Sequence, residues 1–318
     1  MSTLLITSLG MKSGKTSLSG ALCLNLLESG YDVHYCKPFA EDTENDQDTD
    51  FIAKTVLKDT SKVTPPMGTL PSSTTSEESI PLDDILSRIN ELDKERSAEK
   101  SVTIIETPPL AHSSEGISNI ARNFIKGCGT HVILVSNLQD LAGGTLPKNA
   151  DIVSGRLLGL IINNVPRYKT KNVVDELAPL LERDSVTFLG SIPEDRTMMA
   201  LTVDQIANNL DSQWIIGQNR SSDLVEHFLI GGNVMDWGIE YFRRKKNKAV
   251  IVRGNRPDLQ LAALSTHSSC LLLTDGASPT EYVLHEARAR NVPLIKVNMD
   301  TIAAADALGH LVSLATTH

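Results

Sequence analysis

Apolar residues in the first part of the chain gather in short continuous runs that alternate with stretches of helical spacing. Short runs predict buried strands, and repeats every three or four residues predict amphipathic helices. Strands are predicted from Leu4 and over 33–36, 102–105, 132–135, 158–162 and 186–192, with helices over 16–29, 82–92 and 172–182. Residues 64–81 are rich in Pro, Ser and Thr and predict an irregular loop. The alternation favours a parallel sheet with helices on both faces.

A second series of elements begins near Arg196. Thr202 and Gln205 have the spacing of a capping box ahead of a helix. Further strands are predicted over 249–252, 271–274 and 294–297, and helices over 257–265, 279–290 and 301–314. This second pattern predicts a smaller α/β sandwich, so the expected fold class of the whole chain is α/β.

The turn between the first strand and the first helix carries Ser13-Gly14-Lys15-Thr16-Ser17. A helix start offers free backbone N–H groups and a positive dipole end, which suit a phosphate. Lys15 would add charge on the β- and γ-phosphates, and the Thr16 hydroxyl would bind Mg²⁺. The strict phosphate-loop pattern begins with a glycine where Leu9 stands, and Gly10 comes one residue later. We therefore expect a shortened nucleotide-binding loop; the alternative is an ordinary strand-turn-helix.

Two further residues at strand ends suit a nucleotide. Lys37 ends the second strand, on the side of an open parallel sheet where ligands bind. There it can bridge a γ-phosphate and a second, acidic substrate, or it is simply a solvated lysine. Asn163 ends a later strand, and its amide can read the adenine edge with one donor and one acceptor. The alternative for Asn163 is a turn cap, a role that Asn164 could also fill.

Carboxylates near the loop suggest a magnesium site. Glu106 ends the apolar strand over 102–105, where it can hold Mg²⁺ through water opposite Thr16, because this ion prefers hard oxygen ligands. Asp48 and Asp50 are candidates for a second carboxylate. The other residues of that acidic stretch are expected to form a solvated face.

Composition narrows the function classes. The 318 residues include 30 basic and 39 acidic side chains, a formal net charge of −9, which disfavours binding to nucleic acid or anionic membrane. No stretch approaches the roughly 20 apolar residues of a membrane span, and the amino terminus lacks the pattern of a signal peptide. The four cysteines are isolated, which predicts reduced thiols. We therefore expect a cytoplasmic protein.

Other catalytic or ligand-binding patterns are absent from the sequence. No Ser/His/Asp grouping supports nucleophilic hydrolysis, and the eight histidines have no metal-ligand spacing. A basic run, Arg243, Arg244, Lys245, Lys246 and Lys248, is interpreted as the end of a helix, where the dipole favours cations.

With these residues in place, the first part of the chain resembles the dethiobiotin synthetase-like branch of the P-loop proteins. The matching pieces, in family order, are Ser13-Gly14-Lys15-Thr16, Lys37-Pro38, Ile105-Glu106, Gly159-Leu160-Ile161-Ile162-Asn163 and Ile192-Pro193-Glu194. The version fused at the amino terminus of long bacterial phosphotransacetylases is more similar, because it also continues into a DRTGG domain. Here that signature reads Asp195-Arg196-Thr197-Met198-Met199, and residues 253–258 and 275–279 resemble two loops of that domain.

The resemblance implies a P-loop nucleotide-binding domain over 1–195 and a DRTGG-like regulatory domain over 196–318. It also implies roles at five positions: phosphate binding at Lys15, magnesium at Thr16 and Glu106, substrate phosphate at Lys37, and adenine at Asn163. Lys15 and Lys37 would be the catalytic groups. Thr107-Pro108-Pro109 replaces a glycine-rich segment of the synthetase and lacks two N–H donors, so ATP binding is better supported than dethiobiotin formation. Acetyl transfer is not expected, because it would need a further carboxyl-terminal domain.

Three functions remain open from the sequence. The first is an ATP- and Mg²⁺-binding regulatory protein, with or without slow hydrolysis, that responds to a small-molecule effector or acts on an enzyme of acetate or acetyl-phosphate metabolism. The second is an ATP-dependent carboxylate-activating ligase of the dethiobiotin or cobyrinate amide-forming type. The third is an interaction scaffold with a vestigial loop. Both related groups usually assemble from several copies, so a homo-oligomer is expected.

Overall fold

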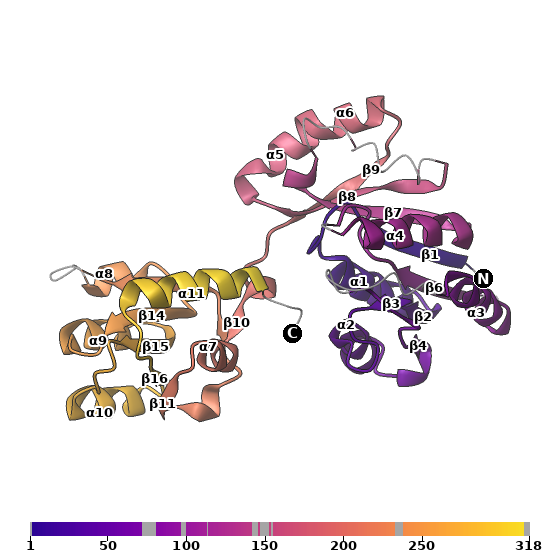
Figure 1. The fold of residues 1–318 in the computed structure, drawn as a ribbon. Helices are drawn as coiled ribbons and strands as arrows, with labels where there is room; N and C mark the ends of the chain where they lie inside the picture. Colours follow the sequence, from indigo (N-terminus) through magenta and orange to yellow (C-terminus); the bar gives the residue numbers. More distant parts are fainter. Residues whose placement is uncertain are drawn as a thin grey trace. The chain divides into compact units, whose positions relative to one another are not determined.

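The computed structural model describes residues 2–71, 81–96, 100–112, 114–141, 146, 153, 155–232 and 238–314 (Figure 1). The chain divides into two compact units, one ending at Glu194 and the next beginning at Asp195. Half of the irregular loop predicted over 64–81, residues 72–80, lies outside the described residues, and the described half includes a short strand over Gly68–Thr69. Among the described helices, none has both the length and the apolar character needed to cross a membrane.

The first unit is built on a seven-stranded sheet in which all neighbouring strands are parallel. In spatial order the strands are β4 (Val63–Thr64), β2 (Asp32–Cys36), β6 (Ser101–Glu106), β1 (Ser2–Ser8), β7 (His131–Asn137), β8 (Leu157–Val165) and β9 (Phe188–Pro193). A small separate pair is formed by β3 (Phe39–Ala40) and β5 (Gly68–Thr69). The predicted parallel sheet is confirmed, and the carboxyl ends of its strands share one edge.

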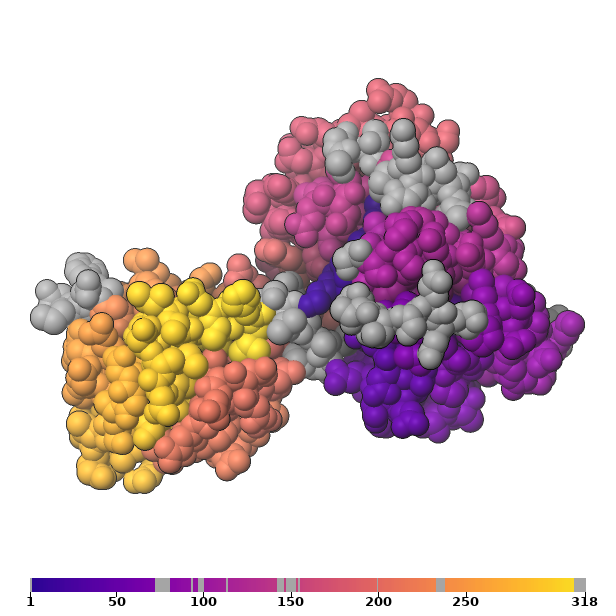
Figure 2. Space-filling model, in the orientation of Figure 1, coloured from indigo at the N-terminus to yellow at the C-terminus, as the bar shows by residue number. Residues whose placement is uncertain are grey.

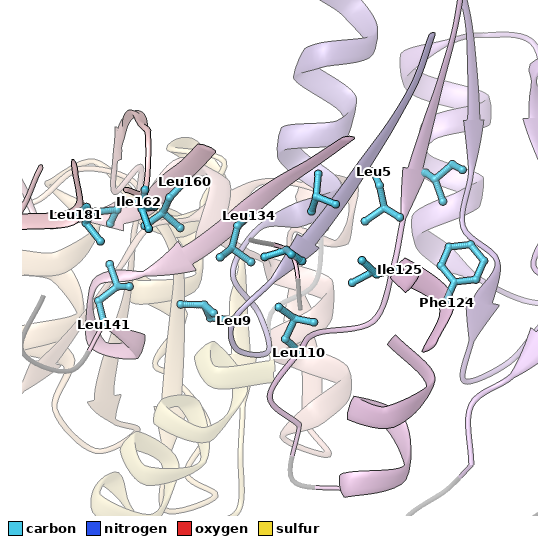
Figure 3. Close-up of a cluster of buried hydrophobic side chains, with 14 of the residues drawn as sticks. Leu5, Leu9, Leu110, Phe124, Ile125, Leu134, Leu141, Leu160, Ile162 and Leu181 are labelled. Carbon is cyan, nitrogen blue, oxygen red and sulfur yellow. The ribbon is translucent and has the colours of Figure 1, made fainter. Parts of the chain in front are cut away.

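Helices cover both faces of this sheet. They are α1 (Lys15–Glu28), α2 (Gln47–Phe51), α3 (Leu82–Glu95), α4 (Glu115–Cys128), and the pair α5 (Thr170–Asn172) and α6 (Ala178–Arg183), which a π-helical turn over Val173–Leu177 joins. Successive strand residues point to opposite faces. Ile6 therefore packs in the cluster that includes α1, whereas Leu5 belongs to a cluster with Ile85 of α3. Phe124 of α4 belongs to the same cluster as Leu5 (Figure 3).

Leu9 explains the missing glycine of the phosphate loop. Its side chain is buried in the same cluster as Leu5, where Figure 3 shows it near Leu110. Its backbone N–H donates to the carbonyl of Val135, so β1 is extended by one paired residue. The chain can leave the sheet only after Leu9, and the turn consequently starts at Gly10.

The second unit has a five-stranded sheet of its own. In spatial order its strands are β11 (Gln213–Ile216), β16 (Leu294–Lys296), β15 (Ser268–Thr274), β14 (Lys248–Arg253) and β13 (His227–Gly231), and a separate pair is β10 (Leu201–Thr202) with β12 (Leu224–Val225). Only β11 runs antiparallel to its neighbour in the larger sheet. The smaller α/β unit predicted from the sequence is thus present.

Helices again lie on both faces of the second sheet. One face is packed by α7 (Val203–Asn209) and α11 (Thr301–Leu314), which lie side by side (Figure 1 and Figure 2), and the other by α8 (Gly238–Arg243), α9 (Pro257–Leu264) and α10 (Glu281–Ala289). The predicted capping box is confirmed: the Thr202 hydroxyl accepts from the Gln205 N–H at 3.1 Å, and the Gln205 side chain accepts from the Thr202 N–H at 2.9 Å.

Lys248 does not belong to a helix end, which corrects the interpretation of the basic run. Helix α8 ends at Arg243, whereas Lys248 begins β14 and is completely buried. Its ammonium donates to the carbonyl of His267 at 2.8 Å. Burial lowers the pKa of Lys248 from 10.5 to about 8. Nothing in the sequence marks Lys248 as different from the four basic residues before it, because its burial results from the pairing of β14 with neighbouring strands.

Candidate nucleotide-binding site

The candidate residues meet at the carboxyl-terminal edge of the first sheet. β1 leads into the loop before α1, β2 into Lys37, and β6 ends on Glu106, while Asn163 lies near the end of β8. Because these strands are parallel, their ends face the same side, which is where open α/β sheets bind ligands.

The loop presents its backbone to this edge. Gly14 is the N-cap of α1 with φ +79°, and Lys12 also has a positive φ of +51°. The Ser13 hydroxyl donates to the carbonyl of Gly10 at 2.8 Å, which closes the turn. Within the described part of the chain, no oxygen accepts a hydrogen bond from the amides of Lys15, Thr16 or Ser17. These are the unpaired donors of a helix start, and they suit an anion.

Side chains approach both glycines of the loop so closely that a Cβ at either position would displace them. A Cβ on Gly14 would lie 2.1 Å from the Nδ2 atom of Asn163, and a Cβ on Gly10 would lie 2.8 Å from a carboxylate oxygen of Asp140. Asp140 is itself fixed by accepting from the backbone N–H of Asn137 at 3.2 Å. Because Gly10 and Gly14 have no side chains, Asp140 and Asn163 can approach the backbone of the loop.

Asn163 holds the loop in this shape. Its Nδ2 donates to the carbonyl of Ser13 at 2.9 Å, and the side chain is buried. The neighbouring Asn164 instead donates to the side-chain oxygen of Asn137 at 3.2 Å. A role for Asn163 in reading adenine stays a prediction.

Lys15 points back along the loop. Its ammonium donates to the Ser8 hydroxyl at 3.0 Å. Burial lowers the pKa of Lys15, and the nearby carboxylates of Glu106 and Asp48 partly oppose this shift. The Ser8 hydroxyl is uncharged. A phosphate at the loop would give the Lys15 ammonium a negatively charged partner instead.

Glu106 is a buried carboxylate surrounded by hydroxyl groups. Its Oε1 accepts from Thr16 at 2.9 Å, and its Oε2 accepts from Tyr35 at 2.9 Å and from Ser19 at 3.2 Å. Burial raises the pKa of Glu106, and the charge of Lys15 opposes the rise. Because the Thr16 hydroxyl donates its proton to Glu106, the lone pairs of its oxygen are left for a cation.

Lys37 is held between two carboxylates. Its ammonium lies 2.6 Å from both Asp46 and Asp48. Burial alone would lower the pKa of Lys37, but these two carboxylates outweigh it and raise the pKa. Asp50 instead forms an exposed ion pair with Lys54. The structure thus brings Asp48, but not Asp50, to Lys37; a metal role for either one stays a prediction.

The residues present fit a magnesium-bound nucleotide. Within the residues that the structure describes, no group of three or more His, Cys, Asp or Glu side chains could hold a metal by itself. Mg²⁺ bound with a nucleotide needs no such cage, because it uses one or two protein oxygens together with phosphates and water. The Thr16 hydroxyl beside Glu106 supplies that kind of donor set.

The segment after β6 is hydrogen-bonded to the end of β1. The N–H groups of Leu110 and Ala111 donate to the carbonyls of Ser8 and Leu9, each at 2.8 Å, and the Thr7 hydroxyl donates to Pro108 at 3.0 Å. The two prolines, which deprive this segment of two N–H donors, therefore lie in a buried stretch that is hydrogen-bonded to β1.

Four residues of the site were not predicted from the sequence: Ser19, Tyr35, Asp46 and Asp140. Two had a usable signal. Tyr35 stands two residues before Lys37, the spacing of one face of a strand, although β2 itself ends at Cys36. Ser19 follows Thr16 by three residues on a helix. Asp46 caps α2 by accepting from the Thr49 N–H at 2.9 Å. A helix of five residues is too short to be recognised from sequence spacing, so its cap could not be predicted.

Comparison with known families agrees with this geometry. Residues 2–202 match the family described as AAA domain, which is more than half of the chain. The chain belongs to the AAA domain family. Residues 205–311 match the DRTGG domain, so the two-part resemblance deduced from the sequence is confirmed. The AAA domain thus corresponds to the unit that holds the loop.

Individual relatives are more distant. A phosphate acetyltransferase of Synechocystis is 29% identical over 123 residues, which are 37% of this chain and only 17% of that enzyme. The MinD cell division protein of Aquifex aeolicus has a TM-score of 0.41 at 14% identity and covers 61% of this chain and 83% of its own. The CBS and DRTGG domains of a Clostridium perfringens pyrophosphatase, solved with the activator diadenosine tetraphosphate, have a TM-score of 0.33 at 18% identity and cover 39% of this chain and 55% of that one.

Proposed function

We propose that this protein binds Mg·ATP at the loop of its AAA domain and that the bound state regulates a partner through the DRTGG domain. The observation that carries the proposal is the convergence of Lys15 and the Thr16–Glu106 pair beneath the unpaired amides at the start of α1. These groups supply positive charge, N–H donors and a cation-binding hydroxyl within one turn of chain.

Each group would have a distinct task. The amides of residues 15–17 would bind phosphate oxygens, and Lys15 would exchange its bond with Ser8 for a phosphate. Thr16, held by Glu106, would bind Mg²⁺, whose charge offsets that of the phosphates. We assign these tasks to a domain of residues 1–195.

The regulatory half of the proposal rests on domain content. A DRTGG domain, which we place over 196–318, follows the AAA domain, and part of the chain is similar to a phosphate acetyltransferase. We infer that nucleotide binding is coupled to a small-molecule effector or to an enzyme of acetyl-phosphate metabolism in a homo-oligomer, with a coupling free energy of about 1–3 kcal/mol.

A titration with Mg·ATP tests the nucleotide site. We expect saturable binding by the intact chain and a loss of affinity of roughly 10- to 100-fold in Lys15→Ala, the effect of removing a charged hydrogen-bond donor. Lys94→Ala, an exposed lysine in the last turn of α3, is the matched control and should bind as the native chain does. Absence of binding at millimolar Mg·ATP, or equal affinity in Lys15→Ala, would refute the proposal.

A carboxylate-activating ligase is the second candidate. Lys37 favours it, because this cation lies close enough to Lys15 and Glu106 for their charges to interact. In the ligase, Lys37 would leave Asp46 or Asp48 to bind a transferred phosphate. The Lys37 variant described in the Discussion separates the two functions.

A further inference from the structure

The two oxygens of Glu106 have different partners. Oε1 accepts only from Thr16, whereas Oε2 accepts from both Tyr35 and Ser19 among the described residues. Tyr35 and Ser19 are completely buried, so neither can touch a nucleotide bound outside the loop. Their contact with the site passes through Glu106.

The two donors come from two different elements, β2 and α1, both of which contact β6. Tyr35 lies in β2 opposite Ile104 of β6, two residues before Glu106. Ser19 lies in α1, three residues after Thr16 and therefore on the same side of the helix. Glu106 is thus held by the strand beside it and by the helix that begins at the loop.

A glutamate has three rotatable side-chain bonds, and a buried carboxylate with unfilled acceptor sites is costly. Two donors on Oε2 fill that oxygen and restrict rotation of the carboxylate. Oε1 then stays at Thr16. Burial, and next the charge of Glu106, keep the pKa of Tyr35 well above 10, so its phenol retains the proton that it donates.

We propose that Tyr35 and Ser19 are positioning residues that hold Glu106 against Thr16 and thereby set how strongly Mg²⁺ increases nucleotide affinity. This inference rests on the proposed Mg·ATP function of the AAA domain. The inference predicts an effect on ATP affinity in the presence of Mg²⁺ but not in its absence, because Tyr35 and Ser19 do not contact the amides or Lys15 that would bind phosphate.

The test compares ATP affinity in excess Mg²⁺ with ATP affinity in EDTA for the intact chain. Tyr35→Phe and Ser19→Ala should each reduce this affinity ratio by about three- to tenfold, the effect of one hydrogen bond, and leave the affinity in EDTA unchanged. Glu106→Gln should abolish the effect of Mg²⁺ on ATP affinity, so that the affinity ratio is near one. Tyr31→Phe and Ser29→Ala, both exposed, are the controls and should keep the native ratio.

Three results would overturn the inference. They are a native affinity ratio in Tyr35→Phe and Ser19→Ala, an equal fall of affinity with and without Mg²⁺, and a loss of the ratio in the control variants. If Tyr35→Phe does not fold, Ser19→Ala decides alone, because it removes a single oxygen from a helix. If the native chain does not bind ATP at all, the underlying Mg·ATP function is refuted. This outcome is seen in the native protein alone and so cannot be confused with failure of the inference.

Discussion

Gly14 shows how tightly single atoms define the loop. Its φ of +79° is nearly the same as that of Gly30, at +81°, but a Cβ on Gly14 would meet Asn163, whereas one on Gly30 would meet no atom within 4 Å. Gly30→Ala should therefore cost only the backbone strain, about 1–2 kcal/mol. Gly14→Ala should cost more and also weaken Mg·ATP binding, because Asn163 must release the carbonyl of Ser13.

Urea unfolding and an ATP titration on both alanine variants measure this difference. A second substitution, Asn163→Ala, should restore part of the stability lost in Gly14→Ala by removing the collision. Equal stability and equal nucleotide affinity in Gly14→Ala and Gly30→Ala would show that the approach of Asn163 does not constrain the loop.

Lys37 separates the regulatory protein from the ligase. In the regulatory protein Lys37 mainly holds Asp46 and Asp48, so Lys37→Ala should lower Mg·ATP affinity by a few-fold and leave any slow hydrolysis per bound nucleotide unchanged. In a ligase the turnover would fall far more than the affinity. Binding and phosphate release measured on the same samples, with Lys54→Ala as the exposed control, give the answer. A turnover loss that exceeds the affinity loss would favour the ligase.

The candidate site was only partly predictable at this scale. Lys15, Glu106 and Asn163 could be found because they end or follow apolar strands, and strand ends of a parallel sheet converge. Asp140 and Asp46 could not be found, because their importance comes from the atoms that meet them: Gly10, distant in sequence, for Asp140, and Lys37, across an irregular acidic stretch, for Asp46. No local pattern reports such a contact.

At the scale of elements, continuous apolar strands were the strongest signal. Most strands of the first sheet left an apolar run that could be located. Strand β4 was missed, because its two residues, Val63 and Thr64, adjoin the segment predicted to be an irregular loop. Helix α4 was missed although Ile117, Ala121 and Phe124 follow helical spacing, since polar residues separate them and a glycine lies near each end of the helix. Strands β11 and β13 were also missed; both are partly exposed, and they form through pairing with β16 and β14.

An interior strand of a sheet can also bury a charge, as Lys248 at the start of β14 shows. Lys248 has a folded pKa of about 8 and an unfolded value near 10.5, so burial disfavours its charged form. The unfolded chain binds more protons between these two values, and the free energy of unfolding should therefore rise with pH from about 8 to 10.5, by up to about 3 kcal/mol. Below pH 8 that stability is absent.

Lys248→Met keeps an unbranched side chain, one atom shorter than that of lysine, and removes the charge. It should unfold at a higher urea concentration than the native chain at pH 7 and lose the part of the pH dependence that lies between 8 and 10.5. Lys245→Met, an exposed neighbour in the basic run, is the control and should retain that dependence. A native pH profile in Lys248→Met would contradict this view of the buried lysine.

At the scale of the whole molecule, the chain combines two α/β units, each with its own sheet and its own hydrophobic clusters on both faces. The order of motifs along the sequence was enough to predict the two families. The bounds predicted for the two domains, 1–195 and 196–318, stay a prediction. The nucleotide loop, the buried carboxylate and Lys37 all belong to the first unit. The second unit contributes the DRTGG domain, through which the proposed regulation would act.

The most direct measurement is the response of the loop amides of the intact chain to Mg·ATP, followed by nuclear magnetic resonance. The account predicts that the N–H signals of Lys15, Thr16 and Ser17 shift on titration and saturate together, and that Lys15→Ala requires much more nucleotide. If those signals stay in place at saturating Mg·ATP while others move, the nucleotide binds elsewhere and the central claim is wrong.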